Sequence, residues 1–354
     1  MKCKFWSPEL LNLVPYTPGE QPKINDLIKL NTNENPYPPT PRINSLLKHF
    51  TVDHLRRYPD PQSSELTSTI AQYYGVDNSN VFIGNGSDEV LAHTFMAFFR
   101  QDAPILMPDI SYSFYTVYCD LYNIDFKPIP IEDDFSISLE KYNIANGGIV
   151  FANPNAPTGH TLALSEIEEL LIKNQQSLVV VDEAYVDFGA QSAIELTKKY
   201  DNCLVIQTLS KSRSLAGLRI GFAIGSAHLI AALDRVKNSF NSYPLDMLAQ
   251  ASAIAAFADE NYFKVTIAKV IATRNWTHKQ LTALQFSVIP SNTNFLLVKH
   301  DSIQAIDIME FLRDRKIIVR HFSTQRINNY LRISIGTDEQ MQTLVDTLNE
   351  MITA

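Results

Sequence analysis

A lysine and an acidic residue, each following an apolar segment, are the side chains best placed for covalent chemistry. Lys211 follows the segment Leu204–Ile206, and Asp182 follows the segment Leu178–Val181, 29 residues earlier (211 − 182). This spacing fits one strand–helix–strand unit, so the two residues are expected to end different strands of one sheet. In open α/β sheets, ligands bind outside the carboxyl ends of the strands. Taken alone, Lys211 is more readily interpreted as a solvated lysine in a polar loop, and Asp182 is equally well interpreted as a helix N-cap.

Two turns follow further strand-like segments. The turn Gly84–Glu89 follows Val81–Ile83 and opens a helix, where free backbone N–H groups bind anions. It is not the dinucleotide fingerprint, because the third glycine would fall on Glu89, and it lacks the lysine of a P-loop. The turn Asn153–Gly159 follows Ile149–Phe151 and is braced by prolines. By themselves, the two segments are also consistent with an ordinary N-cap and an ordinary turn.

One ligand uses all four of these features together, and that ligand is pyridoxal 5′-phosphate. A lysine forms the Schiff base, and a carboxylate pairs with the pyridinium nitrogen and keeps it protonated. A hydrogen-bond donor holds the ring phenolate, and a helix N-terminus takes the phosphate. The four segments therefore indicate a pyridoxal-phosphate site at one edge of a sheet.

Apolar segments alternate with helical patterns between residues 50 and 245. Apolar strands without internal alternation, separated by helices, predict an α/β fold with a mostly parallel sheet covered on both faces. The predicted strands are Val81–Ile83, Ile105–Met107, Ile149–Phe151, Leu178–Val181, Leu204–Ile206 and Ile220–Ile224. The predicted helices are Asp88–Phe99, Ser113–Tyr122, Ser165–Ile172 and Ala193–Tyr200.

The remaining residues predict an N-terminal arm and a second domain. Residues 1–45 contain eight prolines and are expected to be extended rather than helical. A long helical stretch from Leu245 to about Leu284 leads into a smaller α+β domain. Its predicted strands are Phe286–Ile289, Phe295–Val298, Ile317–Val319 and Leu331–Ile335, and its predicted helices are Ile303–Asp314 and Glu339–Met351. We therefore expect an arm over 1–45, a large domain over 46–245 and a small domain over 246–354.

Composition excludes several classes of protein. The chain has 354 residues, of which 45% are hydrophobic and 19% charged, so it can bury a large core and is not disordered. A net charge of −8 argues against non-specific nucleic-acid binding. Cys3, Cys119 and Cys203 are too scattered for a disulfide framework and suit a reducing cytoplasm. No segment predicts a membrane span or a signal peptide, and His49 and His54 lack the partners of a metal site.

Motifs along nearly the whole chain resemble one enzyme family. They are Leu30–Pro36, Gly86–Glu89, Asn155–Gly159, Asp182–Tyr185, Ser210-Lys211 and Leu215–Arg219, with the further segments Val14–Tyr16, Ile317–Arg320 and Tyr330–Ser334. On these motifs the sequence resembles the fold-type I pyridoxal-phosphate-dependent transferases, in the class II aminotransferase family. Within that family it is similar to the histidinol-phosphate aminotransferases. The resemblance implies a large domain with a sheet of the seven-stranded type and a smaller α+β domain.

The resemblance also implies roles for residues around the cofactor. Lys211 would carry the cofactor and move the proton between the substrate Cα and the cofactor C4′. Asp182 would hold the pyridine N–H, Tyr185 the ring oxygen, and Tyr112 would stack on the ring. The cofactor phosphate would be bound by the backbone amides of Gly86, Ser87 and Asp88 and by the side chains of Ser210 and Arg219.

Other residues are implied to serve the partner subunit and the substrates. Tyr58 would reach the cofactor phosphate of the neighbouring subunit, so the resemblance implies a homodimer with composite sites. The N-terminal arm would pack on the small domain and on that subunit. Arg332 would bind the α-carboxylate of glutamate, and Tyr16 and Arg320 would bind the phosphate of histidinol phosphate. The implied reaction converts histidinol phosphate and 2-oxoglutarate to imidazole acetol phosphate and glutamate in histidine biosynthesis.

One position departs from the family pattern. The family often has an asparagine directly before the second proline of the turn, facing the ring oxygen, and here that position is Ala156. Alanine cannot donate a hydrogen bond. We expect Asn155 to replace it, with Asn153 as the second choice.

Four alternative functions compete with the implied reaction. An aromatic or broad-specificity aminotransferase and a phosphothreonine decarboxylase share the same fold. A pyridoxal-phosphate-sensing regulator would need a DNA-binding domain, and the chain has no spare basic helical segment. A nicotinamide dehydrogenase is disfavoured because the glycine fingerprint fails.

Overall fold

The computed structural model describes residues 4–11 and 13–353, so Cys3 lies outside the described residues. Its larger sheet has seven strands in the order β2-β8-β7-β6-β5-β3-β4. All neighbouring pairs are parallel except the two pairs that β8 makes with β2 and β7. This is the mostly parallel α/β sheet that the apolar segments predicted. The strands are β2 (Val81–Asn85), β3 (Ile105–Pro108), β4 (Phe126–Ile129), β5 (Ile149–Ala152), β6 (Val179–Asp182), β7 (Cys203–Thr208) and β8 (Ile220–Gly225).

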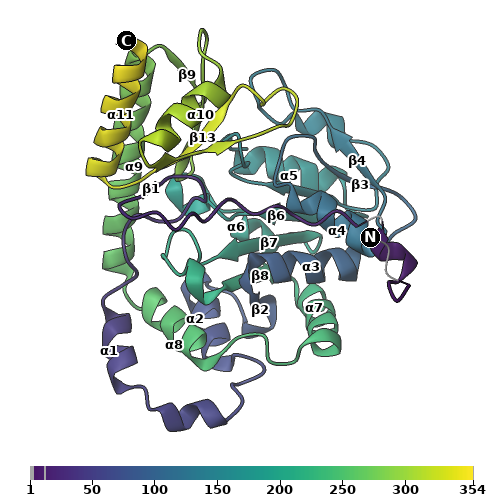
Figure 1. Cartoon of the computed structure of the whole chain (residues 1–354). Helices are drawn as coiled ribbons and strands as arrows, with labels where there is room; N and C mark the ends of the chain where they lie inside the picture. Colours follow the sequence, from purple (N-terminus) through teal and green to yellow (C-terminus); the bar gives the residue numbers. More distant parts are fainter. Residues whose placement is uncertain (1–3, 12, 354) are drawn as a thin grey trace.

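Both faces of this sheet are buried, which explains why its strands are apolar without alternation. Val179 and Val181 of β6 belong to one hydrophobic core and Val180 belongs to the other, because successive side chains point to opposite faces. The first core includes residues of α2 (Ser64–Tyr74), α5 (Leu164–Lys173), α6 (Ile194–Thr197) and α8 (Met247–Phe257). The second includes residues of α3 (Gly86–Phe98), α4 (Phe114–Tyr122) and α7 (Ala227–Phe240) (Figure 1).

The smaller part of the molecule is built on an antiparallel sheet with a third core. The strand order is β12 (Arg320–His321), β13 (Leu331–Ser334), β10 (Phe295–His300) and β9 (Phe286–Val288). Helices α9 (Glu260–Ala283), α10 (Ala305–Asp314) and α11 (Asp338–Thr353) contribute buried residues to that core. The two sheets therefore bury separate apolar clusters.

The N-terminal segment runs across the molecule between the two parts (Figure 1). A short 3₁₀ helix (Pro8–Leu11) is followed by mostly extended chain, as the prolines predicted. Strand β1 (Ile28–Lys29) pairs in parallel with β11 (Ile317–Ile318), and the Ser334 amide donates to the Leu30 carbonyl at 2.9 Å. The segment is thus fixed to the smaller part before α1 begins.

The structure differs from the sequence-based expectations in several elements. The helical stretch after residue 245 is two helices, because the chain turns at Ala258 and Asp259. The Asp259 side chain caps the second helix by accepting a hydrogen bond from a backbone amide in the first turn of α9. Helix α8 packs in the core of the larger sheet, although it was expected with the small domain. The predicted helix 193–200 shortens to α6. Elements α1 (Arg42–His49), α2, α7 and β4 were not expected; β4 is an edge strand that contains Pro128.

The strand expected over Ile317–Val319 divides into two elements. Residues Ile317 and Ile318 form β11 beside the N-terminal segment, whereas Arg320 opens β12 beside β13. The chain thus changes partners at Val319, and Arg320 begins the separate strand β12.

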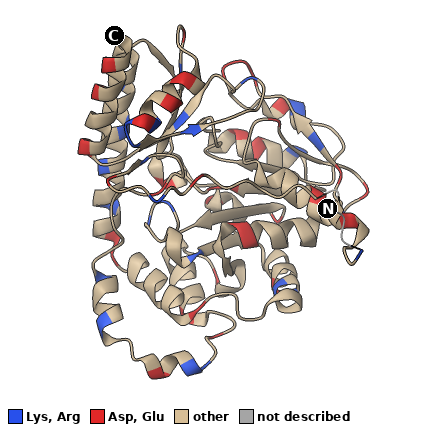
Figure 2. Ribbon diagram, in the orientation of Figure 1, with Lys and Arg blue, Asp and Glu red and all other residues tan. Residues whose placement is uncertain are grey.

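Basic and acidic residues are interspersed along the ribbon of both parts of the molecule (Figure 2). Among residues 4–11 and 13–353, no helix combines the length and apolar character needed to span a bilayer. Within the same residues, no cluster of three or more histidine, cysteine or acidic side chains is arranged to hold a metal ion.

Candidate active site

A cavity of about 780 Å³ lies where the larger sheet, the N-terminal segment and the smaller sheet meet. Most of the expected site residues line it; they are Tyr16, Ser87, Asp88, Tyr112, Asp182, Tyr185, Ser210, Lys211, Arg219, Arg320 and Arg332. The expected residues Gly86, Asn155 and Tyr58 do not line it. The tertiary structure therefore brings together side chains separated by more than 300 residues of sequence.

The strand register explains why these residues converge. Parallel pairing sets Ala152 level with Asp182, and Asp182 level with Ile206, so β5, β6 and β7 end at one edge. Lys211 follows β7 directly. Because β8 is antiparallel, it begins at this edge rather than ending there, and Arg219, the residue before β8, lies beside the other groups.

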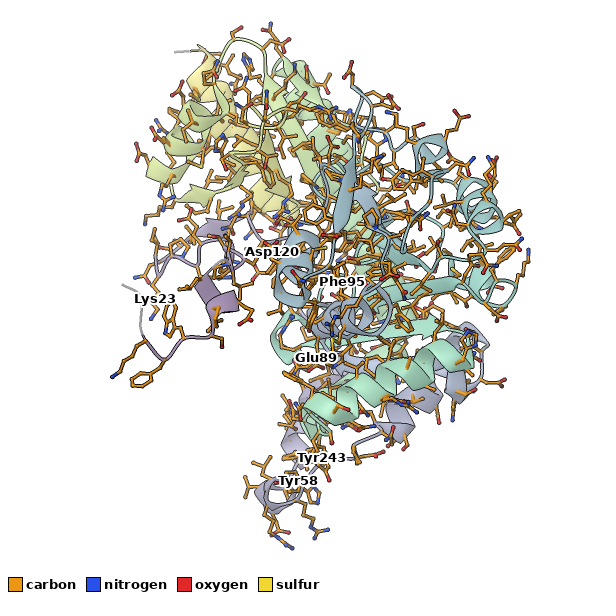
Figure 3. The ribbon with its side chains drawn as sticks, turned by 90° about the vertical axis from the view of Figure 1, so that its right-hand side faces the viewer. Lys23, Tyr58, Glu89, Phe95, Asp120 and Tyr243 are labelled. Atoms are coloured by element: carbon orange, nitrogen blue, oxygen red, sulfur yellow. The ribbon has the colours of Figure 1, made fainter. Side chains whose placement is uncertain are left out.

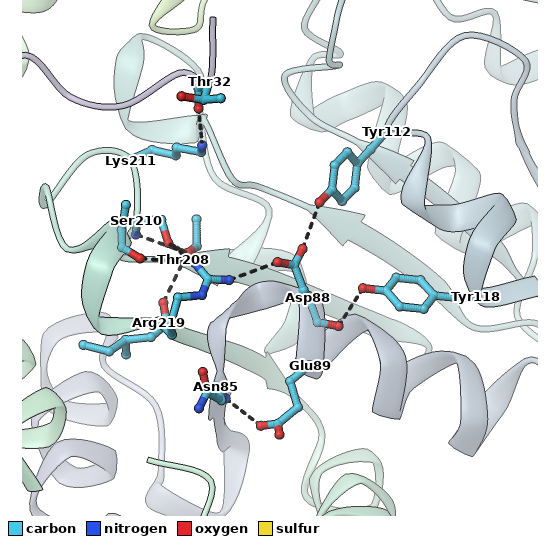
Figure 4. A network of polar contacts seen from close by, with 12 residues as sticks. Thr32, Asn85, Asp88, Glu89, Tyr112, Tyr118, Thr208, Ser210, Lys211 and Arg219 are labelled. Carbon is cyan, nitrogen blue, oxygen red and sulfur yellow. Dashed lines mark hydrogen bonds and ion pairs between the residues drawn. The ribbon is translucent and has the colours of Figure 1, made fainter. Parts of the chain in front are cut away.

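The start of α3 forms an anion cradle at the same edge. The first backbone N–H groups of a helix have no intrahelical partner and carry the positive end of the helix dipole. A Cβ on Gly221 of β8 would lie 2.2 Å from the Ser87 nitrogen, so only glycine lets the strand approach this close. Gly86 has φ +82°, which also favours glycine. Arg219 completes the cradle and contacts Asp88 at 3.0 Å (Figure 4).

Asp182 is a buried carboxylate held by two donors. The Tyr115 hydroxyl donates to Oδ2 at 2.8 Å, and the Ala184 amide donates to Oδ1 at 3.2 Å. Burial raises the pKa of Asp182 to about 6, and the two hydrogen bonds oppose that rise because they favour the charged form. Since Asp182 also lines the cavity, it can accept a hydrogen bond from a ligand that carries an N–H group.

Lys211 and two tyrosines surround the centre of the cavity. The Lys211 Nζ donates to the Thr32 carbonyl at 3.2 Å and lies 5.8 Å from the centre of the Tyr185 ring. The Tyr112 hydroxyl donates to Asp88 at 2.9 Å, which fixes its ring beside the cradle (Figure 4). An amine, a phenol and an aromatic face thus meet in one space.

Two arginines lie side by side in the same cavity. Arg320 and Arg332 are directly opposite each other in the pairing of β12 with β13. Among the described residues, neither guanidinium forms an ion pair with a carboxylate, and the Arg332 Nε has no hydrogen-bond partner. The pKa of Arg332 is lowered by burial and by the nearby charge of Arg320. Adjacent uncompensated cations favour an anionic ligand.

Tyr16 brings the N-terminal segment into this region. Its ring stacks on Phe114 with the centroids 4.6 Å apart and lies 6.3 Å from the ring of Tyr112. The aromatic contacts hold the segment across the cavity, so that Tyr16 lines it together with the arginines.

The geometry does not support Asn155 as a donor to a ligand. Its side chain is completely buried, and its Nδ2 donates to the Ile110 carbonyl and to the Thr158 hydroxyl, both at 3.0 Å. Both amide hydrogens are therefore donated to other groups of the protein, one of them inside the turn. Asn153 is bonded to the backbone of Leu162 through both its side-chain atoms and does not line the cavity either. At this position the cavity wall is Ala156, so the expectation for Asn155 is corrected.

Tyr58 lies outside the cavity of its own chain. Its side chain is 81% exposed, and its ring stacks on Tyr243 with the centroids 4.7 Å apart. Figure 3 shows the two tyrosines together at one end of the molecule. A large exposed aromatic pair of this kind is typical of a contact surface.

Sequence reasoning missed several residues that contact the expected groups, among them Tyr115 and Asn33. Tyr115 donates to Asp182, and Asn33 donates to Tyr185. Asn33 lies in a segment that was already singled out, Leu30–Pro36, but no feature of the sequence indicated its partner. Tyr115 is three residues after Tyr112, the spacing of one helical turn, which was a usable signal.

Comparison with known proteins identifies relatives over the full length. The family model for aminotransferase class I and II matches residues 25–348. The chain is 56% identical over 349 residues to "Histidinol-phosphate aminotransferase 1" of Hydrogenovibrio crunogenus, with 99% of this chain and 98% of that protein covered. It is 55% identical over 354 residues to "Histidinol-phosphate aminotransferase" of Acinetobacter baylyi, again with 99% and 98% covered.

Solved structures share the fold at lower identity. The histidinol-phosphate aminotransferase of Sinorhizobium meliloti, solved in complex with pyridoxal-5′-phosphate, has a TM-score of 0.90 at 24% identity, covering 99% of this chain and 98% of that one. The L-threonine-O-3-phosphate decarboxylase of Porphyromonas gingivalis has a TM-score of 0.79 at 22% identity, covering 93% and 100%. At these identities the likeness concerns the fold.

The Tyr115–Asp182 contact leads to a test in the ligand-free protein. Tyr115→Phe removes a donor that favours the carboxylate, so the pKa of Asp182 should rise from about 6 by about one unit. Infrared titration of the protonated carboxyl group, assigned by its loss in Asp182→Asn, measures the midpoint.

Tyr142→Phe is the matched control for this substitution. Tyr142 is also completely buried, and its hydroxyl forms no hydrogen bond within the described residues, so its removal should leave the Asp182 midpoint unchanged. An unshifted midpoint in Tyr115→Phe would show that the contact does not stabilise the anion.

Proposed function

The chain belongs to the class I and II aminotransferase family and, within it, to the histidinol-phosphate aminotransferases, and on this premise we propose its reaction. It transfers the amino group of L-histidinol phosphate to 2-oxoglutarate, giving imidazole acetol phosphate and L-glutamate in histidine biosynthesis. The observation that carries this function is the pair of unneutralised arginines, Arg320 and Arg332, in the cavity that also holds Lys211.

The cofactor is pyridoxal 5′-phosphate, and the residues present fit it. The cradle at the start of α3 matches a phosphate, since Gly221 keeps the strand close to the Ser87 amide and Arg219 supplies a cation. Asp182 offers an acceptor for the ring N–H and Tyr185 offers a donor for the ring oxygen, and both residues line the cavity. When bound, the cofactor supplies an electron sink for the charge that develops at the substrate Cα.

The side chains around the ring have distinct tasks in this proposal. Lys211 would hold the cofactor through its amine and would then move the proton between the substrate Cα and the cofactor C4′. Asp182 stays anionic and holds the pyridine N–H, supported by the Tyr115 hydroxyl. Tyr185 donates to the ring oxygen. Ser87, Ser210 and the backbone of α3 bind the phosphate, and Tyr112 packs on the ring.

The two half-reactions place different anions at the arginines. Histidinol phosphate has a phosphate and no carboxylate, whereas glutamate has two carboxylates and no phosphate. Arg332 fits the α-carboxylate of glutamate because its planar guanidinium can bind two oxygens, and Arg320 with Tyr16 fits the phosphate of histidinol phosphate. An enzyme specific for aromatic amino acids would have no use for Arg320, because an aromatic side chain carries no second anion.

We propose that the enzyme is a homodimer with composite sites. Tyr58 does not line the cavity of its own chain. Its exposed ring stacks on Tyr243, and this aromatic pair suits a surface that a second copy of the chain covers. Exposed apolar side chains Val52, Leu55 and Phe240 belong to the same segments. We also propose a cytoplasmic location, because Cys119 and Cys203 are free buried thiols, as suits a reducing compartment.

A direct assay tests the reaction. Purified protein is given histidinol phosphate, phenylalanine or phosphothreonine with 2-oxoglutarate, and glutamate and CO₂ are measured. Histidinol phosphate should show the highest kcat/KM and phosphothreonine should release no CO₂. Lys211→Ala should abolish glutamate formation, because no other amine replaces it. A preference for phenylalanine would favour the aromatic aminotransferase, and release of CO₂ the decarboxylase.

Arg320→Ala tests the anion assignment. Loss of a cation that pairs with a buried anion costs about 2–5 kcal/mol, so kcat/KM for histidinol phosphate should fall roughly 30-fold or more. Phenylalanine should be affected less. The control Arg315→Ala removes an exposed arginine that does not line the cavity and should change neither value. Equal losses on both substrates in Arg320→Ala would contradict the assignment.

Mixing two inactive variants tests the composite site. In a heterodimer of Tyr58→Ala with Lys211→Ala, the chain that keeps Lys211 receives Tyr58 from its partner, so one site is complete. After subunit exchange, half of the dimers are mixed and each has one complete site of two, so about a quarter of wild-type activity should return. Activity no higher than the average of the two parent variants would show that Tyr58 does not serve the partner.

A further inference from the structure

Three consecutive residues of the N-terminal segment each contact a different group of the site. The Asn31 carbonyl accepts from Arg332 at 2.9 Å, and the Thr32 carbonyl accepts from Lys211 Nζ at 3.2 Å. The Asn33 side chain donates to the Tyr185 hydroxyl oxygen at 2.9 Å. Of the three contacts, only the last uses a side chain of the segment. The contact made by Asn33 therefore depends on the residue type at its position, whereas a backbone carbonyl is present whatever the residue.

Asn33 is held rigidly, with every polar group bonded. It is 1% exposed; its backbone amide donates to Ser334 Oγ, and its carbonyl accepts from Asn294, both at 2.9 Å. The Ser334 hydroxyl donates in turn to Asn33 Oδ1 at 2.9 Å. Because the oxygen of the side-chain amide is used by Ser334, its nitrogen faces Tyr185. The backbone has φ +56°, a conformation that asparagine tolerates better than most residues.

This arrangement decides where the proton of Tyr185 can go. A phenol has one proton to donate, and an amide NH₂ group cannot accept it. The proton must therefore point away from Asn33, and Tyr185 lines the cavity that contains Lys211. A hydroxyl that accepts one hydrogen bond also becomes a stronger donor, because the two bonds polarise each other.

The turn that follows β5 leaves this task to Asn33. Position 156 is alanine, and both amide hydrogens of Asn155 are donated to other groups of the protein, the Ile110 carbonyl and the Thr158 hydroxyl. Tyr185 is therefore the donor to the ring oxygen of the cofactor, because the turn after β5 supplies no second donor. Its orientation matters correspondingly more.

We propose that Asn33 is the positioning residue of Tyr185, directing its proton to the ring oxygen of the cofactor in place of a donor at position 156. The inference rests on the proposed function, since it needs bound pyridoxal phosphate. Asn33 acts only through Tyr185 and touches no reacting atom.

The test reads the spectrum of the bound cofactor rather than activity. Absorbance is titrated against pH in the wild type, Asn33→Gly, Tyr185→Phe and the double variant. Losing a donor to the ring oxygen raises the spectroscopic pKa of the bound cofactor, and Asn33→Gly should raise it by about 0.5–1 unit. Glycine is chosen because it accepts the positive φ. The double variant should match Tyr185→Phe, because Asn33 has no other route of action.

Asn31→Gly is the matched control. Asn31 is a buried asparagine of the same segment, but its side chain donates to the Glu20 carbonyl, away from Tyr185, so the spectroscopic pKa should not change. An unchanged pKa in Asn33→Gly, or a shift that adds to that of Tyr185→Phe, would overturn the inference.

A second variant covers the case in which Asn33→Gly does not fold. Asn33→Asp keeps the shape and the tolerance of positive φ, but its oxygen captures the Tyr185 proton, so the spectroscopic pKa must rise; an unchanged value would again overturn the inference. Failure of the wild type to bind pyridoxal phosphate would instead contradict the proposed function.

Discussion

The register of the parallel strands is the constraint on which the site depends. Because β5, β6 and β7 end at one edge and β8 starts there, the end of β6, the start of α3 and the loop after β7 face one space. Asp182, Arg219 and Lys211 thereby meet without any long excursion of the chain. A shift of one residue in β6 would turn Asp182 to the other face of the sheet.

Charge is separated across the cavity. A buried carboxylate, Asp182, lies on the larger sheet, where burial raises its pKa and the Tyr115 hydroxyl opposes that rise. Arg320 and Arg332 lie on the smaller sheet with no acidic partner among the described residues. One part of the molecule therefore suits a protonated ring nitrogen, and the other suits the anionic groups of the substrates.

The N-terminal segment joins these two parts. Strand β1 pairs with the smaller part, while the residues after it bond to Lys211 and Tyr185 of the larger part. The last of these contacts is made by the Asn33 side chain, which donates to the Tyr185 hydroxyl oxygen. The site is consequently shared among three segments of the chain rather than built from the larger sheet alone.

The sequence by itself determined the α/β class and the central strands, and it pointed to eleven residues that line the cavity. Local patterns suffice there, since uniformly apolar strands reveal a doubly covered sheet and short motifs mark the strand ends. It did not reveal β4 or α7, the packing of α8 on the larger sheet, or the partners of Asp182 and Tyr185. Those depend on contacts between distant residues: Asn33 donates to Tyr185 across 152 positions, and Asn155 donates to the Ile110 carbonyl across 45. Only the tertiary structure decides which buried side-chain amide donates to a residue of the cavity. An amide hydrogen that is already bonded to another group of the protein cannot also be donated to a ligand.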